Sequence, residues 1–229
     1  MISVVIPTFN GRRYLASAIR SVLAQTLAPD EVVVADDGSE DGSAAIAQGF
    51  GAPVRVLALP HRGLPATLND AVAAARGDVL AFLDDDDLWA PEKLALQVRA
   101  LAADPELEAV FCHMVQFTDR AAAIADPSEI PAAVRPRAKG IAKSCMLIRR
   151  ASFDRVGPFD PGSRLADFIE WYQRATAAGL RVRVLDEVLA FRRRHGRNTS
   201  LTQAPALHAR YLTIARGAIA RRRGPATAD

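Results

Sequence analysis

The chain has 229 residues, half of them hydrophobic, which is enough for one α/β domain with a sizeable core. Its two cysteines, Cys112 and Cys145, lie inside apolar segments, and no group of His and Cys has zinc-ligand spacing, so we expect buried thiols rather than a disulfide or a zinc site. The net charge is +3, and nine arginines with no acid lie between Arg192 and Arg223. The first residues lack the features of a signal peptide or a membrane span, so we expect a cytoplasmic protein.

The first half alternates short β-branched runs with segments of helical periodicity, which is typical of a parallel sheet with crossover helices. We expect buried strands at 2–6, 31–35, 53–59 and 78–83, and helices at 11–25, 43–50, 64–76 and 91–103. The loops that follow the strands are rich in Pro, Asn, Asp and Gly. In open parallel sheets the ligand crevice lies at the carboxyl ends of the strands, so these loops predict a binding site.

The second half is less regular. The segment 118–140 is rich in Ala and Pro and too long for a tight turn, so we expect a mobile surface loop. The remaining expectations are strands at 107–117 and 142–150, a helix at 165–179 ended by Gly179, one or two strands within 181–194, and a last helix at roughly 206–223. This last helix is basic and amphipathic. It either lies on an anionic membrane surface or docks on the domain. Its small apolar face favours docking on the domain.

Four consecutive carboxylates follow the strand expected at 78–83, namely Asp84, Asp85, Asp86 and Asp87. Adjacent negative charges repel one another, so a folded protein that keeps them together usually places something positive among them. The alternative is a solvated acidic turn, which is common for runs of charge. The four residues alone do not decide between a cation site and a turn.

Four segments, in this order, resemble the signature segments of the family 2 glycosyltransferases: 3–43, 75–97, 146–160 and 191–200. The resemblance implies an inverting, nucleotide-sugar-dependent enzyme of the GT-A fold, with a mostly parallel central sheet and helices on both faces. It implies a UDP-sugar donor, or less often a dTDP- or GDP-sugar, and a divalent cation, Mn²⁺ or Mg²⁺. The single domain would comprise a nucleotide-sugar-binding half (1–117), an acceptor and catalytic-base half (118–200), and a C-terminal helix and tail (201–229).

The resemblance assigns roles to the four aspartates. It makes Asp86 the direct metal ligand and brings Asp84 to the ribose or the metal shell, with Asp85 also among the nucleotide-binding residues. A hard cation held by carboxylate oxygens would offset the charge of the departing diphosphate. Asp87 supports this loop or caps the helix that follows.

The nucleobase is expected at Pro7, Thr8 and Phe9, which match family positions that hold the base. The Asp37 carboxylate would accept a hydrogen bond from the uracil imide N–H. Asp36 either joins it in binding the nucleotide or orients the loop.

One position departs from the family pattern on the donor side. Many relatives carry an arginine before the asparagine that Asn69 matches, and this chain has Leu68 there. A phosphate or base contact is then either absent here or supplied by His61 or Arg62 in the preceding loop.

The segment around His195 matches the family segment whose histidine completes the shell of the cation, although a lone histidine after a strand is often a surface or packing residue. Its neighbours Arg193, Arg194 and Arg197 would offset diphosphate charge, because guanidinium pairs with phosphate oxygens. Alternate residues of a strand face opposite sides, so at most one or two of these arginines point inward.

Inversion requires a general base, and the family places this carboxylate at the start of a helix. Asp167 is the first choice. The usual Glu-Asp pair is Ala166-Asp167 here and the register from Arg174 is displaced by one residue, so Glu170 is a competitor. Asp167 and Glu170 are three residues apart and share a helix face.

The expected activity is therefore sugar transfer to an acceptor that the sequence does not identify: a saccharide, lipid-linked sugar, peptide or small molecule. Two rivals remain. A sugar-1-phosphate nucleotidyltransferase needs a Gly-rich triphosphate loop after the first strand, where this chain has a single glycine, Gly11. A non-catalytic nucleotide-sugar-binding scaffold stays open because of the displaced base register. Nucleic-acid binding is not expected, since the arginines lack interleaved aromatic residues.

Overall fold

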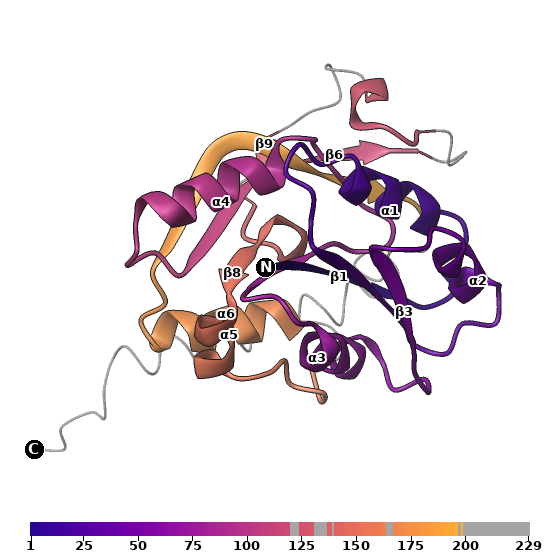
Figure 1. The fold of residues 1–229 in the computed structure, drawn as a ribbon, viewed down its shortest axis with the longest axis horizontal. Coiled ribbons are helices and arrows are strands. Elements are labelled where there is room, and N and C mark those ends of the chain that lie inside the picture. Colours follow the sequence, from indigo (N-terminus) through magenta and orange to yellow (C-terminus); the bar gives the residue numbers. More distant parts are fainter. Residues whose placement is uncertain (120–123, 131–136, 139, 164–166, 197, 199–229) are drawn as a thin grey trace, which may run out of the picture.

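The computed structural model describes residues 1–119, 124–130, 137–138, 140–163, 167–196 and 198. Within these ranges the strands form one sheet in the order β3-β2-β1-β4-β8-β6-β9-β5, with β7 paired to β6. Helices cover both faces of the sheet (Figure 1). The strands are β1 (Ile2–Thr8), β2 (Glu31–Asp36), β3 (Val54–Ala58), β4 (Val79–Phe82), β5 (Leu88–Trp89), β6 (Ala109–Thr118), β7 (Arg137–Ala138), β8 (Leu147–Arg149) and β9 (Val182–Arg194).

The first four strands are parallel, as the alternating pattern predicts. Every residue of β1 and β2 is buried, because helices pack on both faces of this part of the sheet. β3 differs from the expectation of a fully buried strand, since it lies at the edge of the sheet and most of its residues are partly exposed. Because β1 has β2 on one side and β4 on the other, the strand order reverses direction at β1. Such a switch point opens a crevice at the carboxyl ends of the strands.

The second half continues the same sheet in mixed directions. β8 is antiparallel to β4, and β6 is antiparallel to β8. β9 then runs parallel to β6, with register shifts between Phe111 and Met114, and is one long strand rather than two. Its far edge pairs with β5, a two-residue strand that directly follows the acidic run and that periodicity does not predict.

The second half differs in detail from two expectations. Within the segment 118–140, which is expected to be a mobile surface loop, the described residues include a short 3₁₀ helix, η1 (Pro127–Glu129), and the strand β7. The segment 142–150 is not one strand but a 3₁₀ turn, η3 (Lys143–Cys145), followed by β8. The helix α5 (Arg150–Val156) follows at once, and its short length hides it from a periodicity search.

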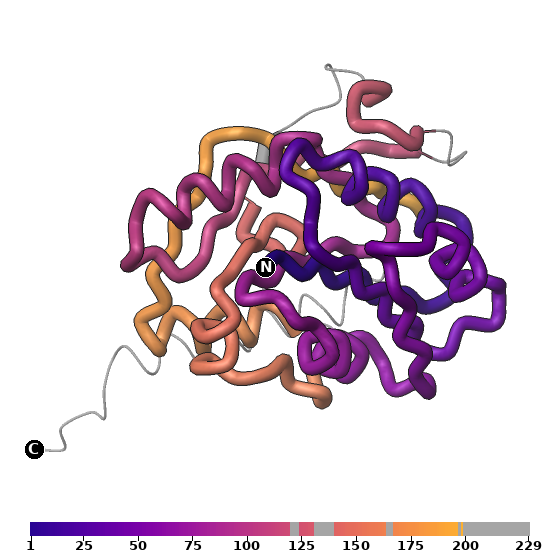
Figure 2. Tube along the Cα trace, viewed as in Figure 1, coloured from indigo at the N-terminus to yellow at the C-terminus, as the bar shows by residue number. Residues whose placement is uncertain are grey.

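The helices form two layers around the sheet. The remaining ones are α1 (Leu15–Leu23), α2 (Ser43–Gln48), α3 (Leu64–Ala74), α4 (Lys93–Ala103) and α6 (Asp167–Ala177). α1 and α4 lie on one side of the sheet, and α3, α5 and α6 lie on the other (Figure 1). The N-terminus lies near the centre of the view in Figure 2, and β1 runs from it between the two layers. Gly179 has φ 72° just after α6, as expected for a glycine that ends a helix.

None of the helices in the described ranges has the combination of length and apolar character that a membrane crossing requires. The basic helix expected at roughly 206–223 lies outside the described residues.

The first residue of α4, Lys93, is a fully buried lysine. The Lys93 ammonium donates to Gln97 Oε1 at 2.7 Å and lies 3.9 Å from the centre of the Trp89 ring. Burial lowers the pKa of Lys93 from 10.5 to about 8. The two cysteines are buried and free near it, as the sequence predicts.

We expect Lys93→Met to raise the free energy of unfolding by about 1–3 kcal/mol at pH 7, because a charge whose burial displaces its pKa by this much is costly to the folded state. The folded state binds this proton more weakly than the unfolded chain, so the cost is present below pH 8 and fades as the pH rises towards 10.5. Urea denaturation of both proteins between pH 7 and 10 measures the difference. If the difference in the free energy of unfolding between Lys93→Met and wild type does not shrink as the pH rises, this account is contradicted.

Candidate functional site

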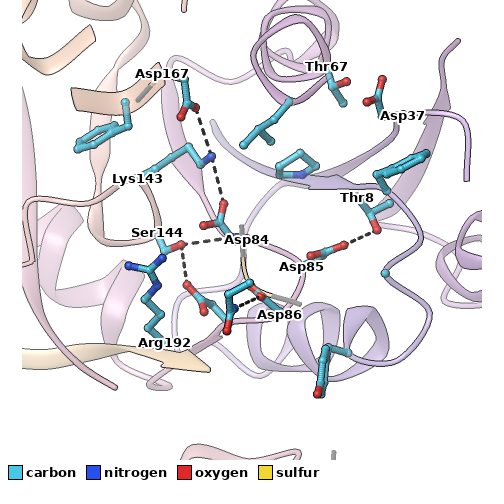
Figure 3. Close-up of a pocket in the computed structure, with 18 of the residues that line it drawn as sticks. Thr8, Asp37, Thr67, Asp84, Asp85, Asp86, Lys143, Ser144, Asp167 and Arg192 are labelled. Carbon is cyan, nitrogen blue, oxygen red and sulfur yellow. Dashed lines mark hydrogen bonds and ion pairs between the residues drawn. The ribbon is translucent and has the colours of Figure 1, made fainter. Parts of the chain in front are cut away.

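A pocket of about 670 Å³ opens at the carboxyl ends of the parallel strands. Its walls come from the loops after β1, β2 and β4 on one side, and from η3, the first turn of α6 and the end of β9 on the other (Figure 3). The parallel register explains the convergence, because Thr8 at the end of β1 lies opposite Asp36 at the end of β2. All four consecutive aspartates line this pocket.

The acidic run folds into a turn that is tied to the second half of the chain. The Asp87 N–H donates to the Asp84 carbonyl oxygen at 3.1 Å, which closes the turn. The Asp87 carboxylate is 3% exposed and accepts from Ser144 Oγ at 3.0 Å and from the Arg193 N–H at 3.1 Å. It does not cap the next helix, whose N-cap is Glu92, so that alternative is wrong. Burial and the neighbouring Asp86 raise the pKa of Asp87 well above its usual range.

Asp85 lies at the floor of the pocket against the loop after β1. Its Oδ2 accepts from Thr8 Oγ1 at 2.5 Å. The surrounding protein removes most of its water, and this desolvation, followed by the charge of Asp86, raises the pKa of Asp85 to about 8. Gly11 packs so closely here that a Cβ on it would overlap the Asp85 carboxylate and the Thr8 hydroxyl.

Asp86 meets the segment after β9, as the resemblance implies. His195 Nε2 lies 2.9 Å from Asp86 Oδ2, and Asn198 Nδ2 donates to the same oxygen at 2.9 Å. The His195 N–H donates to Asn198 Oδ1 at 2.6 Å, and the imidazole stacks on Tyr14 with ring centres 4.7 Å apart. These contacts orient the histidine toward the carboxylate. Asn198 and Tyr14 are not among the expected site residues, because their contacts with Asp86 and His195 follow from the fold.

Arg193 does not face a diphosphate, which corrects one expectation. Its guanidinium is fully buried, forms an ion pair with Asp119, and donates to the carbonyl oxygens of Asp86 and Ile124. It also lies 4.7 Å from the centre of the Tyr14 ring. Arg193 therefore supports, from behind, the acidic loop that Asp84, Asp85, Asp86 and Asp87 form. The neighbouring Arg192 lines the pocket instead, and Arg197 lies outside the described residues.

The end of the pocket where a nucleobase is expected has a flat aromatic wall. Phe9 and His61 stack with ring centres 4.1 Å apart and an angle of 23° between their planes. The Asp37 carboxylate accepts from the backbone N–H groups of Arg62 and Gly63 at 2.8 and 2.9 Å, and His61 Nδ1 lies 2.9 Å from Asp37 Oδ2. Asp37 thus shapes the loop that presents His61 to the pocket.

The other expected nucleotide residues divide into two groups. Pro7, Thr8 and Phe9 line the pocket. Asp36 is buried beneath the loop and accepts from the Ser39 N–H at 3.0 Å, so it orients the loop rather than lining the pocket. Leu68 is fully buried in the core.

The two candidate bases are placed differently. Asp167, at the start of α6, lines the pocket, and among the described residues its Oδ2 is buried and accepts no hydrogen bond. Glu170 is partly buried on the same helix and is not among the residues that line the pocket. Lys143 lies between Asp167 and the acidic loop (Figure 3). No sequence pattern indicates a site role for this lysine, because its position follows from the 3₁₀ turn η3.

A divalent cation can be matched to the donor set around Asp86. Within the described ranges no three His, Cys, Asp or Glu side chains gather as a metal cage. The pocket instead offers the Asp86 carboxylate and the His195 imidazole, 2.9 Å apart. Mg²⁺ is usually bound by one or two carboxylates together with substrate phosphates and water. The residues present therefore fit an ion that is shared with a phosphorylated ligand.

This fold and pocket define an α/β protein with an acidic pocket at the switch point of its sheet. The chain belongs to glycosyl transferase family 2, whose family model matches residues 3–157. An uncharacterized glycosyltransferase of Nostoc sp. is 33% identical over 232 residues, which cover 90% of this chain and 68% of that protein. The uncharacterized glycosyltransferase EpsJ of Bacillus subtilis is 28% identical over 224 residues, which cover 90% of this chain and 64% of EpsJ.

Solved structures show the same GT-A fold. TarS of S. aureus in complex with UDP-GlcNAc superposes with a TM-score of 0.69 at 20% identity, over 86% of this chain and 59% of that one. The mannosyltransferase PcManGT of Pyrobaculum calidifontis, in complex with GDP-Man and Mn²⁺, gives a TM-score of 0.65 at 22% identity, over 86% and 58%. The expected fold class is therefore confirmed, and the chain spans less than two thirds of each of these two structures.

We expect Gly11→Ala to destabilise the protein by about 1–3 kcal/mol, because the added methyl group forces the Asp85 carboxylate or the Thr8 hydroxyl from its place. The matched control is Gly196→Ala, since Gly196 also lines the pocket but has open space around a built Cβ. Urea denaturation measures both variants. Equal stability of the two would show that the Gly11 contact imposes no constraint.

Proposed function

We propose that this protein is an inverting glycosyltransferase that moves one sugar from a nucleotide-diphosphate sugar, preferably a UDP-sugar, to an acceptor. The observation that carries the proposal is the meeting of three groups in one pocket: the acidic loop with Asp86, the imidazole of His195, and the carboxylate of Asp167. A cytoplasmic location, expected from the sequence, is part of the proposal.

The donor is proposed to lie along the wall formed by the first half. A nucleobase would stack near Phe9 and His61, whose rings present a flat surface, while Asp84 would reach the ribose or the metal shell. TarS has been solved with UDP-GlcNAc and PcManGT with GDP-Man, and both ligands are nucleotide-diphosphate sugars. Family membership supports the same class of donor here.

The cation is proposed to be Mn²⁺ or Mg²⁺, held by Asp86 and His195. When bound, it would offset the negative charge of the diphosphate leaving group. Asn198 and Tyr14 keep the two protein ligands in place, because Asn198 donates to Asp86 and Tyr14 stacks on His195. Such supporting contacts are typical of metal sites that need a fixed ligand geometry.

Asp167 is proposed as the general base. A base must be able to accept a proton from the attacking group, and among the described residues Asp167 Oδ2 accepts no hydrogen bond, although the Lys143 ammonium lies 3.7 Å from it. Its position across the pocket from the β1 loop suits a nucleophile that attacks the face opposite the leaving diphosphate. Glu170 does not line the pocket, which supports Asp167 as the first choice.

The acceptor would enter from the wall formed by the second half. Besides Lys143, Ser144 and Asp167, this wall includes four apolar residues and one guanidinium: Met114, Ile141, Phe168, Ile169 and Arg192. These features do not select one acceptor, so the proposal leaves its identity open.

We expect UDP, dTDP or GDP to bind at least about tenfold more tightly with Mn²⁺ than without, since the ion would bridge the protein and the diphosphate. Calorimetric titration of each nucleotide, with and without Mn²⁺, measures this effect. Asp86→Ala and His195→Ala should abolish the gain from the metal while leaving the base wall intact. Failure of all three nucleotides to bind in the presence of metal would favour a degenerate scaffold over an enzyme.

Asp167→Asn should lower turnover by about 100-fold or more while nucleotide and metal binding stay unchanged, because the amide keeps the shape of the side chain but cannot take the proton. Glu170→Gln is the matched control and should retain turnover. Turnover is measured as hydrolysis of the donor, with water as the acceptor: the assay follows release of UDP from UDP-GlcNAc, or of GDP from GDP-mannose, in the presence of Mn²⁺. An inactive Glu170→Gln beside an active Asp167→Asn would reverse the assignment.

A further inference from the structure

The 3₁₀ turn η3 joins the two walls of the pocket. Ser144 accepts from the Asp84 N–H at 3.3 Å through its hydroxyl and donates to Asp87 at 3.0 Å. The Ser144 carbonyl oxygen accepts from Trp89 Nε1 at 2.8 Å. The turn is thereby fixed to the acidic loop by the Ser144 side chain and to β5, which follows that loop, by the Ser144 backbone.

Lys143, in the same turn, points into the space between the two walls. It is 6% exposed, and its ammonium lies 3.2 Å from Asp84 Oδ1 and 3.7 Å from Asp167 Oδ2 (Figure 3). Asp84 belongs to the loop after β4, and Asp167 begins α6, so one cation contacts both walls of the pocket. The backbone that carries this cation is the turn already fixed to the loop.

The charge on Lys143 is retained despite its burial. Burial alone would favour the neutral amine, but the Asp84 and Asp167 carboxylates outweigh it and raise the pKa of Lys143 above its ordinary value. The ammonium is thus a permanent counter-charge at neutral pH. Among the residues that the structure describes, Arg192 also lines this side of the pocket, whereas Arg155 of α5 pairs with Glu108.

We propose that Lys143 is a positioning residue for the transfer reaction: it holds the Asp167 carboxylate at a fixed place relative to the donor-binding loop. This inference rests on the proposed function, in which Asp167 takes the proton. Without the ammonium, Asp84 and Asp167 would face each other as two carboxylates and repel. The first turn of α6 would then move away from the loop.

Loss of the Lys143 ammonium would slow the chemical step of sugar transfer. An error of about 1 Å in the placement of a reacting group can cost about 100-fold in rate. The nucleobase wall at Phe9 and His61 has no contact with Lys143 among the described residues, so nucleotide binding should be affected far less than turnover. This split separates a positioning role from a general loss of structure.

The test compares Lys143→Met with Lys143→Arg, using UDP-GlcNAc and GDP-mannose with Mn²⁺ as donors. We expect Lys143→Met to lower kcat for nucleotide release by about 100-fold, with KM and the calorimetric Kd for UDP within about threefold of wild type. Lys143→Arg should recover part of the loss, because it restores a cation in contact with both carboxylates. Lys93→Met is the matched control, since it removes the other buried lysine described, which does not line the pocket, and should leave kcat unchanged.

The outcomes separate the two proposals. If wild type releases nucleotide from its donor but Lys143→Met has the same kcat, the positioning role is overturned and the proposed function stands. If Lys143→Met and Lys143→Arg both lose UDP binding and thermal stability together with kcat, the lysine has only a structural role, and the inference is again overturned. If wild type binds UDP but releases nucleotide from no donor tested, the proposed function fails, and the role of Lys143 fails with it.

Discussion

The structure is organised around one electrostatic constraint, which is the packing of four consecutive carboxylates at the end of β4. Like charges this close cannot all be ionised without partners. In the folded protein each of the four aspartates has a different environment. Asp84 pairs with Lys143, Asp85 accepts from Thr8 and has a pKa of about 8, Asp86 contacts His195 and Asn198, and Asp87 accepts from Ser144 and the Arg193 backbone.

Almost all of these partners come from the second half of the chain. They arrive because one sheet runs through both halves, with β8 beside β4 and β9 paired to β5 directly after the acidic loop. Arg193, on β9, fills the space behind the loop and ties it to Asp119. The acidic loop is therefore a joint between the halves as well as a wall of the pocket. A cation that binds at Asp86 would meet a carboxylate whose position the fold has already set.

The pocket has different chemistry at its two ends. At one end His61 stacks on Phe9 and lies 2.9 Å from Asp37, while the nearby α3 residue Leu68 is part of the core. On the other wall, the displaced register around Ala166 has not removed Asp167 from the pocket. Family membership defines the class of reaction but not the acceptor, because one fold supports members with different substrates.

The sequence by itself determined the parallel half of the sheet, because strands buried on both faces read as continuous apolar runs, and it placed the polar loops at one edge. It also supplied Asp86, His195 and Asp167 through local motifs. The tertiary structure alone decided what lies around them. Lys143, Asn198 and the inward turn of Arg193 depend on contacts between residues far apart in the chain, and the short elements η3, α5 and β5 have too few residues for a period to appear. Local patterns record which residues face a core, but only the folded chain determines which charges meet.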